Sequence, residues 1–148
     1  SADWVAAILA REGVTITPEV KEHLWTALTS LASAPLPERT LTGLAVLLQS
    51  NDLKQALRPY CVGGAYGRLL DAEGEQLGGA AVQVFETEGL IGGGAAAAVL
   101  AYLFHRIGDR LDGRPTLLIV DEGWLALDDD GFAAQLREWL KTLRKKNA

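Results

Sequence analysis

The sequence predicts an α/β fold with an all-helical subdomain on its N-terminal side. Two observations carry this prediction. Apolar residues recur at helical spacing through residues 1–59, with no strand-like run among them. After Pro59, short apolar runs separated by glycines alternate with helical segments, which is typical of a doubly wound α/β domain. We therefore expect residues 1–59 to form a helical subdomain and residues 60–148 to form an α/β region.

Four helices are expected in the helical subdomain. Three follow from the spacing of apolar residues near positions 4–9, 20–31 and 41–48. The second of these has a clear start, because Thr17 offers an N-cap and Pro18 suits the first helical position. Asn51 or Asp52 is expected to cap a short fourth helix.

The predicted α/β region is read from its apolar runs. Arg68–Leu70 and Ala81–Phe85 are expected to be short strands. Ala95–Ile107 is apolar on nearly every face, as expected of a helix that packs on a sheet and is covered on its other side. Thr116–Val120 is an unbroken apolar run of the kind found in a central parallel strand, and Phe132–Leu143 has the pattern of an amphipathic helix.

Composition bounds the classes of function. The chain has 148 residues and a formal net charge of -5, which argues against wholesale nucleic-acid binding but leaves a local basic patch open. Cys61 is the only cysteine and there are two histidines, so no zinc-site spacing exists. The longest apolar run, Ala95–Phe104, is too short to span a bilayer. No signal peptide is visible at the start, so we expect a cytoplasmic protein. The chain contains no methionine, which suggests a piece of a longer protein.

The segment Pro115–Glu122 has the pattern of a Walker B motif, an apolar strand that ends in Asp121 and Glu122. In open α/β sheets, ligands bind beyond the carboxyl ends of the strands. The first acid can hold Mg²⁺, usually through water, and the second can orient the water that attacks a γ-phosphate. From this motif alone, the alternative remains open that two solvated acids simply precede a turn.

No phosphate-binding loop accompanies this motif. The pattern G-x-x-x-x-G-K-[ST] is absent. Gly92–Gly94 precedes a helix, but alanines follow where Lys-Ser or Lys-Thr would be needed, so we interpret the glycines as a turn. A nucleotide site needs backbone donors and a lysine for the phosphates, so this chain is expected to hold at most half of one.

The last predicted helix is patterned in charge. Asp128–Asp130 stand at its start and Arg144–Lys146 at its end, which complements the helix macrodipole. The functional alternative is that Arg144 reaches a nucleotide across a subunit boundary as an arginine finger. Nucleic-acid contact by the basic end is a further alternative.

Several blocks of the sequence resemble the TrbE-type conjugal transfer ATPases of type IV secretion systems. The most specific pair is Pro115–Leu127 and Leu136–Asn147, and Leu41–Gln49, Tyr66–Asp71 and Val84–Leu90 fit the same family. The resemblance implies a partial RecA-like P-loop NTPase domain, the Walker B half, in which residues 1–59 are a helical insertion. By motif match, Asp121 would be the acid associated with Mg²⁺ and Glu122 the catalytic base, with Arg144 a candidate for contact with nucleotide.

The resemblance also implies partners and a location. The parent protein would use ATP and Mg²⁺, would assemble as a hexamer with other secretion or mating-pair-formation subunits, and would work at the cytoplasmic face of the bacterial inner membrane. Because Walker A is missing from this chain, we predict that the chain alone is inactive. Two alternatives are a non-catalytic interaction module of a secretion assembly and a DNA-pumping coupling-protein ATPase.

Overall fold

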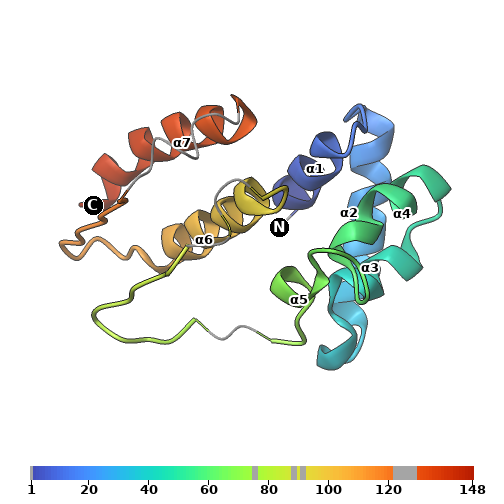
Figure 1. The fold of residues 1–148 in the computed structure, drawn as a ribbon, viewed down its shortest axis with the longest axis horizontal. Coiled ribbons are helices and arrows are strands. Elements are labelled where there is room, and N and C mark those ends of the chain that lie inside the picture. Colours follow the sequence, from blue (N-terminus) through green and yellow to red (C-terminus); the bar gives the residue numbers. More distant parts are fainter. Residues whose placement is uncertain (1, 75–76, 88–89, 91–92, 122–129) are drawn as a thin grey trace. The chain divides into compact units, whose positions relative to one another are not determined.

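The computed structural model describes residues 2–74, 77–87, 90, 93–121 and 130–148. The chain folds as two compact units, Ser1–Val84 and Phe85–Ala148. Figure 1 shows the first unit in blue to green and the second in yellow to red. Among the described residues, no helix is both long and apolar enough to cross a membrane.

The first unit is built from helices whose boundaries follow from their end residues. They are α1 (Ala2–Arg11), α2 (Pro18–Ser33), α3 (Leu41–Leu47), α4 (Asn51–Leu57) and the short α5 (Gly67–Leu70), with 3₁₀ turns η1 (Leu36–Glu38) and η2 (Arg58–Tyr60). The Thr17 hydroxyl accepts from the Val20 amide at 3.2 Å, so the predicted cap of α2 is confirmed. The cap of α4 is Ser50, not Asn51 or Asp52 as predicted, because the Ser50 hydroxyl accepts from the Leu53 amide.

One apolar core holds these helices together. Its fully buried members come from α1, α2, α3, α4 and the two segments that follow α3 and α4: Ile8, Leu9, Leu24, Leu44, Leu48, Leu57 and Tyr60. Each aliphatic side chain buried in this way contributes roughly 1.5–3 kcal/mol relative to exposure. The helical spacing of apolar residues therefore predicted most of the core residues of α1, α2 and α3; Leu47, also on the predicted face of α3, is exposed.

The second unit consists of α6 (Ala96–Arg110), an irregular segment over residues 115–120, α7 (Asp130–Leu143) and the 3₁₀ turn η4 (Arg144–Lys146). The two long helices contact each other (Figure 1). The Phe104 and Trp139 rings lie 4.4 Å apart between centroids, and each helix also has a buried alanine, Ala98 in α6 and Ala133 in α7. Helices were predicted for both regions and are confirmed.

The predicted α/β fold is wrong, and the RecA-like arrangement implied by the resemblance is not seen. The described residues contain helices, turns and irregular segments but no strand. Residues 116–120 have no regular secondary structure, and Leu117 and Ile119 are 83% and 82% exposed. A strand exists only where its backbone groups pair with a neighbour, and an apolar run does not supply that neighbour.

The two shorter predicted strands are also wrong. Arg68–Leu70 lies in α5, where the amides of Leu69 and Leu70 both donate to the Tyr66 carbonyl and thereby close a helical turn. Ala81–Phe85 is irregular, and Val82 and Val84 are exposed. Runs this short carry too little periodicity to separate helix from strand, so tertiary context decided them.

Candidate functional site

Asp121, the predicted Mg²⁺-associated acid, is among the residues that the structure describes. It is exposed and follows the irregular segment that ends at Val120. Glu122, the predicted catalytic base, lies outside the described residues. Within the irregular segment, Thr116 and Leu118 are partly covered, whereas Leu117, Ile119 and Val120 are exposed.

The basic block at the end of α7 divides into two portions with different surroundings. Arg144 and Lys145 are exposed. Lys146 is partly buried, and its Nζ donates to the Gly108 carbonyl oxygen at 2.7 Å. Gly108 lies in the last turn of α6, where unpaired carbonyls and the helix dipole favour a cation. The charge of Lys146 therefore serves α6, whereas the sequence pattern had suggested the dipole of its own helix.

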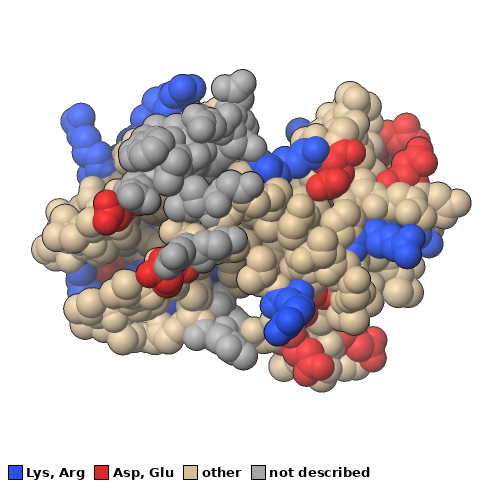
Figure 2. Space-filling view, in the orientation of Figure 1, with Lys and Arg blue, Asp and Glu red and all other residues tan. Residues whose placement is uncertain are grey.

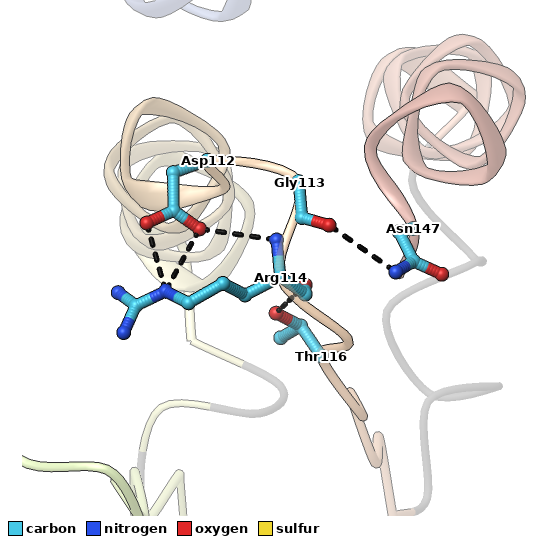
Figure 3. A network of polar contacts seen from close by, with 5 residues as sticks. All are labelled: Asp112, Gly113, Arg114, Thr116 and Asn147. Atoms are coloured by element: carbon cyan, nitrogen blue, oxygen red, sulfur yellow. Dashed lines mark hydrogen bonds and ion pairs between the residues drawn. The ribbon is translucent and has the colours of Figure 1, made fainter.

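A polar network joins Asn147 to the turn before the irregular segment. Asn147 Nδ2 donates to the Gly113 carbonyl oxygen at 3.2 Å (Figure 3). The Thr116 backbone amide donates to the Asn147 backbone carbonyl oxygen at 3.1 Å. Within the turn, the Arg114 backbone amide and Nε both donate to Asp112. The hydrogen bond from the Arg114 backbone, followed by its side chain, holds the pKa of the Asp112 carboxyl below its ordinary value. Sequence reasoning missed this network, because nothing local pairs Asn147 with Gly113.

The hollows in the two units do not resemble a nucleotide site. In the second unit, a hollow of about 150 Å³ lies beside Phe104, Trp139 and Lys146. Pockets that bind a ligand as large as a nucleotide usually have a volume of several hundred Å³. In the first unit, an open groove of about 590 Å³ is lined by Glu12 and Asp52 and by no lysine or arginine. Two carboxylates without a cation would repel phosphates. Neither hollow therefore supplies the phosphate-binding half of the predicted site.

The described residues form no cluster of ligating side chains for a metal ion. Among the described side chains, no group of three histidines, cysteines, aspartates or glutamates could hold a metal ion. Mg²⁺ next to nucleotide normally takes one or two protein carboxylates and completes its shell with water and phosphate oxygens. The exposed Asp121 carboxylate fits that requirement as a single hard oxygen ligand.

On the face shown in Figure 2, acidic and basic side chains are interspersed over the first unit. No large area of one sign is seen on that face of the unit. A continuous basic surface is the electrostatic footprint of nucleic-acid binding, and this view of the first unit does not have one. The basic residues of the chain's end remain the candidate for such contact.

A second polar network organises the first unit. Asp71, which follows α5, accepts from the Thr42 amide at 3.1 Å, from the Thr42 hydroxyl, and from the Val62 amide at 2.7 Å. Thr42 lies in the first turn of α3, whose amides have no partner within the helix. Burial and the nearby Asp71 charge raise the pKa of the Cys61 thiol, which is therefore held in its neutral form.

The chain is similar in sequence to TrbE conjugal transfer proteins over nearly its whole length. The chain is 43% identical over 149 residues to a probable conjugal transfer protein TrbE of Sinorhizobium fredii, a match covering 99% of this chain and 22% of that protein. It is 40% identical to "Conjugal transfer protein TrbE" of Rhizobium radiobacter over 99% of this chain and 18% of that protein. The resemblance to TrbE-type proteins is confirmed.

The match covers nearly all of this chain but only a small part of each relative. A more distant relative, "Type IV secretion system protein virB4" of Bartonella quintana, is 32% identical over 97% of this chain and 19% of that protein. The chain spans about a fifth of the length of the curated relatives it matches. No family model matches the sequence, and no solved structure matches it.

In the structure, the segments that carry the resemblance to TrbE-type proteins contact each other in pairs. Leu41–Gln49 and Tyr66–Asp71 meet through the hydrogen bonds of Asp71 with Thr42. Pro115–Leu127 and Leu136–Asn147 meet through the hydrogen bond from Thr116 to Asn147. Within each unit, therefore, two blocks that carry the resemblance are in direct contact.

Proposed function

We propose that this chain belongs to a TrbE-type ATPase that powers conjugative DNA transfer by type IV secretion. The observation that carries the proposal is Pro115–Asp121, an apolar segment ending in an exposed carboxylate, in a chain 43% identical to a TrbE conjugal transfer protein. The parent would hydrolyse ATP with Mg²⁺ and couple hydrolysis to substrate export or pilus assembly.

Asp121 and Glu122 have separate roles in this proposal. The Asp121 carboxylate would hold Mg²⁺ through water, and the ion when bound would neutralise charge on the β and γ phosphates. Glu122 would accept a hydrogen bond from the attacking water and thereby orient it. Arg144 is exposed on η4 and is our candidate for a guanidinium that reaches the nucleotide of a neighbouring subunit.

The wider setting belongs to the same proposal. The names of the relatives place them in conjugal transfer and type IV secretion. We propose that the parent assembles as a hexamer at the cytoplasmic face of the bacterial inner membrane and contacts other secretion subunits. A DNA-pumping role would instead appear as hydrolysis stimulated by DNA.

The test is phosphate release by the full-length parent protein. Glu122→Gln is expected to lower the hydrolysis rate by at least a hundredfold, because general-base catalysis of this kind contributes roughly 10²–10⁴-fold. Asp121→Asn is expected to impair hydrolysis and raise the Mg²⁺ requirement. The control is Glu138→Gln, which removes a carboxylate exposed on α7 and paired only with Lys141 among the contacts described. Unchanged hydrolysis in the Glu122→Gln protein would sink the proposal.

A second candidate role for the first unit is contact with another protein. Trp25, Val46 and Val62 are 69%, 74% and 75% exposed, so a partner that covered them would bury apolar area. If the chain were only an interaction module, these residues would matter for assembly and Glu122 would not. Parent proteins carrying Val46→Ser or Glu122→Gln, compared for assembly and for hydrolysis, separate the two roles.

A further inference from the structure

The exposed side of α7 carries a row of basic side chains. Arg137, Lys141 and Lys145 follow one another at intervals of four residues, and all three are exposed. Residues four apart lie on the same side of a helix, and Lys145 belongs to η4, which continues α7 directly. These three residues are called the basic row below. Arg144 lies next to the row and is kept apart from it, because it is our candidate for contact with nucleotide.

The opposite side of α7 is held against α6. The Trp139 ring lies 4.4 Å from that of Phe104 between centroids, and Leu143 is buried. Lys146 Nζ donates to the Gly108 carbonyl oxygen at 2.7 Å, which ties η4 to the last turn of α6. Trp139 and Leu143 lie across the helix from the basic row, so these contacts leave the row facing away from α6.

The fold of the second unit leaves most of this charge free for a partner. Lys141 pairs with Glu138 at 2.5 Å, whereas Arg137 and Lys145 have no hydrogen-bond or ion-pair partner among the described residues. A helix C-terminus attracts cations only within its last turn, and Arg137 lies before that turn. From Arg137 to the end of the chain Glu138 is the only acidic residue, although the whole chain has a formal net charge of -5.

We propose that the basic row binds the phosphate backbone of a nucleic acid strand without reading its sequence. From Arg137 to Lys145 the helix rises by about 12 Å. The phosphates of one strand of a duplex are about 3.4 Å apart along its axis, so the row spans roughly three to four of them. Contacts of lysine and arginine with phosphates position a protein on a nucleic acid and carry no sequence information themselves.

A lipid surface fits this side of α7 less well. A helix that lies in a membrane interface inserts an apolar side that bears several large residues. Among the described side chains of α7, Leu140, at 54%, is the one large apolar side chain that is exposed. Trp139 contacts α6 and Leu143 is buried, so neither is available for insertion.

The substitutions change charge and leave the helix intact. Arg137→Gln, Lys141→Gln and Lys145→Gln, made singly and together, keep long side chains of good helix propensity. Glu138→Gln removes the acid beside the row and frees Lys141, so its effect on binding should have the opposite sign. The control is Lys21→Gln, which removes an exposed cation from α2 in the first unit.

The assay is the fluorescence anisotropy of a labelled single-stranded DNA oligonucleotide of mixed sequence, titrated with the full-length parent protein at salt concentrations between about 50 and 200 mM. Each single glutamine variant of the row is expected to raise the Kd by about two- to fivefold, the range of one exposed ion pair. Each should also reduce the slope of log affinity against log salt by about 0.7, and the triple variant should reduce it by about 2. Glu138→Gln should lower the Kd by a similar factor. Phosphate release without DNA should be the same in all of these variants, because none of them changes Asp121 or Glu122.

Each outcome decides the proposal. Weaker binding with a reduced salt slope in the row variants, tighter binding in Glu138→Gln and no change in Lys21→Gln support it. An unchanged Kd and slope in the triple variant, an equal loss in Lys21→Gln, or no DNA binding by the parent overturns it.

Vesicles of equal parts phosphatidylglycerol and phosphatidylethanolamine test the lipid surface. A triple variant that loses binding to these vesicles but keeps its affinity for DNA overturns the proposal in favour of a membrane. Full hydrolysis by Glu122→Gln would overturn the proposed hydrolytic site without changing these results, because the basic row is tested by binding alone.

Discussion

Replacing Asp71 by alanine removes the carboxylate that joins α5 to α3. The carboxylate accepts from the Thr42 amide at 3.1 Å, from the Thr42 hydroxyl and from the Val62 amide at 2.7 Å. Hydrogen bonds to a charged group contribute roughly 1.5–3 kcal/mol each, but bonds that share one acceptor group are far from additive. The Val62 amide also lies 2.9 Å from the Thr42 hydroxyl oxygen and so keeps one partner after the substitution. We therefore expect Asp71→Ala to lower the free energy of unfolding by about 2–4 kcal/mol.

The assay is urea unfolding of the chain followed by far-ultraviolet circular dichroism. At a slope of about 1 kcal/mol per molar urea, the transition of the first unit should move to lower urea by roughly 2 M or more. Asp71→Asn, which keeps one oxygen acceptor, should lie between the alanine variant and the original chain. The matched control is Glu73→Ala, an exposed carboxylate two residues further on. An Asp71→Ala transition within about 0.5 kcal/mol of the control would refute the argument that this carboxylate joins α3 to α5.

Three further predictions concern the core and the helix pair. Burial, followed by the hydrogen bond to Glu12, raises the pKa of Tyr60 from 10.0 to about 12. The stability that the neutral phenol contributes is therefore complete below pH 10 and is lost as pH rises through about 12. Tyr60→Phe should cost about 1 kcal/mol at pH 7 and flatten the fall in unfolding free energy between pH 10 and pH 12; equal slopes in the two proteins would contradict this. In Gly67→Ala the new methyl group would lie far inside van der Waals contact of the Cys61 carbonyl oxygen, so the free energy of unfolding should fall by about 1–3 kcal/mol in a thermal unfolding experiment. The control Gly74→Ala should change it very little, because the space around Gly74 is open. Trp139→Ala removes the ring whose centroid lies 4.4 Å from that of Phe104, at a tilt of 35°, and should weaken the α6–α7 contact by about 2 kcal/mol. Hydrogen exchange in α6 should then be faster, and unchanged exchange there would argue against the contact.

The helical portion of the fold was predictable because its signals are local. Apolar spacing of three and four residues predicted most of the core residues of α1 to α3, and the Thr17–Pro18 pair marked the start of α2. Such signals lie within one or two turns of the residues they organise. The error at the start of α4 is of the same local kind, since Ser50 and Asn51 are both good caps and only the observed hydrogen bond selects Ser50.

For the candidate site, the sequence predicted Asp121 at the end of a buried strand, but the structure places it after an irregular, largely exposed segment. The chemistry of Asp121 remains a prediction, and the long-range contacts near the site were not predicted. The contacts of Lys146 with Gly108 and of Asn147 with Gly113 join residues 38 and 34 positions apart. A run of basic residues is consistent with a helix end or with a binding surface. Nothing in the run itself predicts that Lys146 is partly buried against α6 while Arg144 is exposed.

The sequence alone determined where most of the helices lie, where α2 begins, which residues of α1 to α3 enter the core, and the resemblance to TrbE-type proteins. Each of these depends on the order of neighbouring residues and on motifs read directly from the chain. Only the tertiary structure decided that Arg68–Leu70 is helical and that Thr116–Val120 is irregular, with Leu117, Ile119 and Val120 exposed. It alone revealed that Asp71 reaches Thr42 and that Asn147 reaches Thr116. A strand, a cap supplied from another helix and a hydrogen bond across the fold each need a partner distant in sequence, and local pattern does not specify which partner the folded chain brings near.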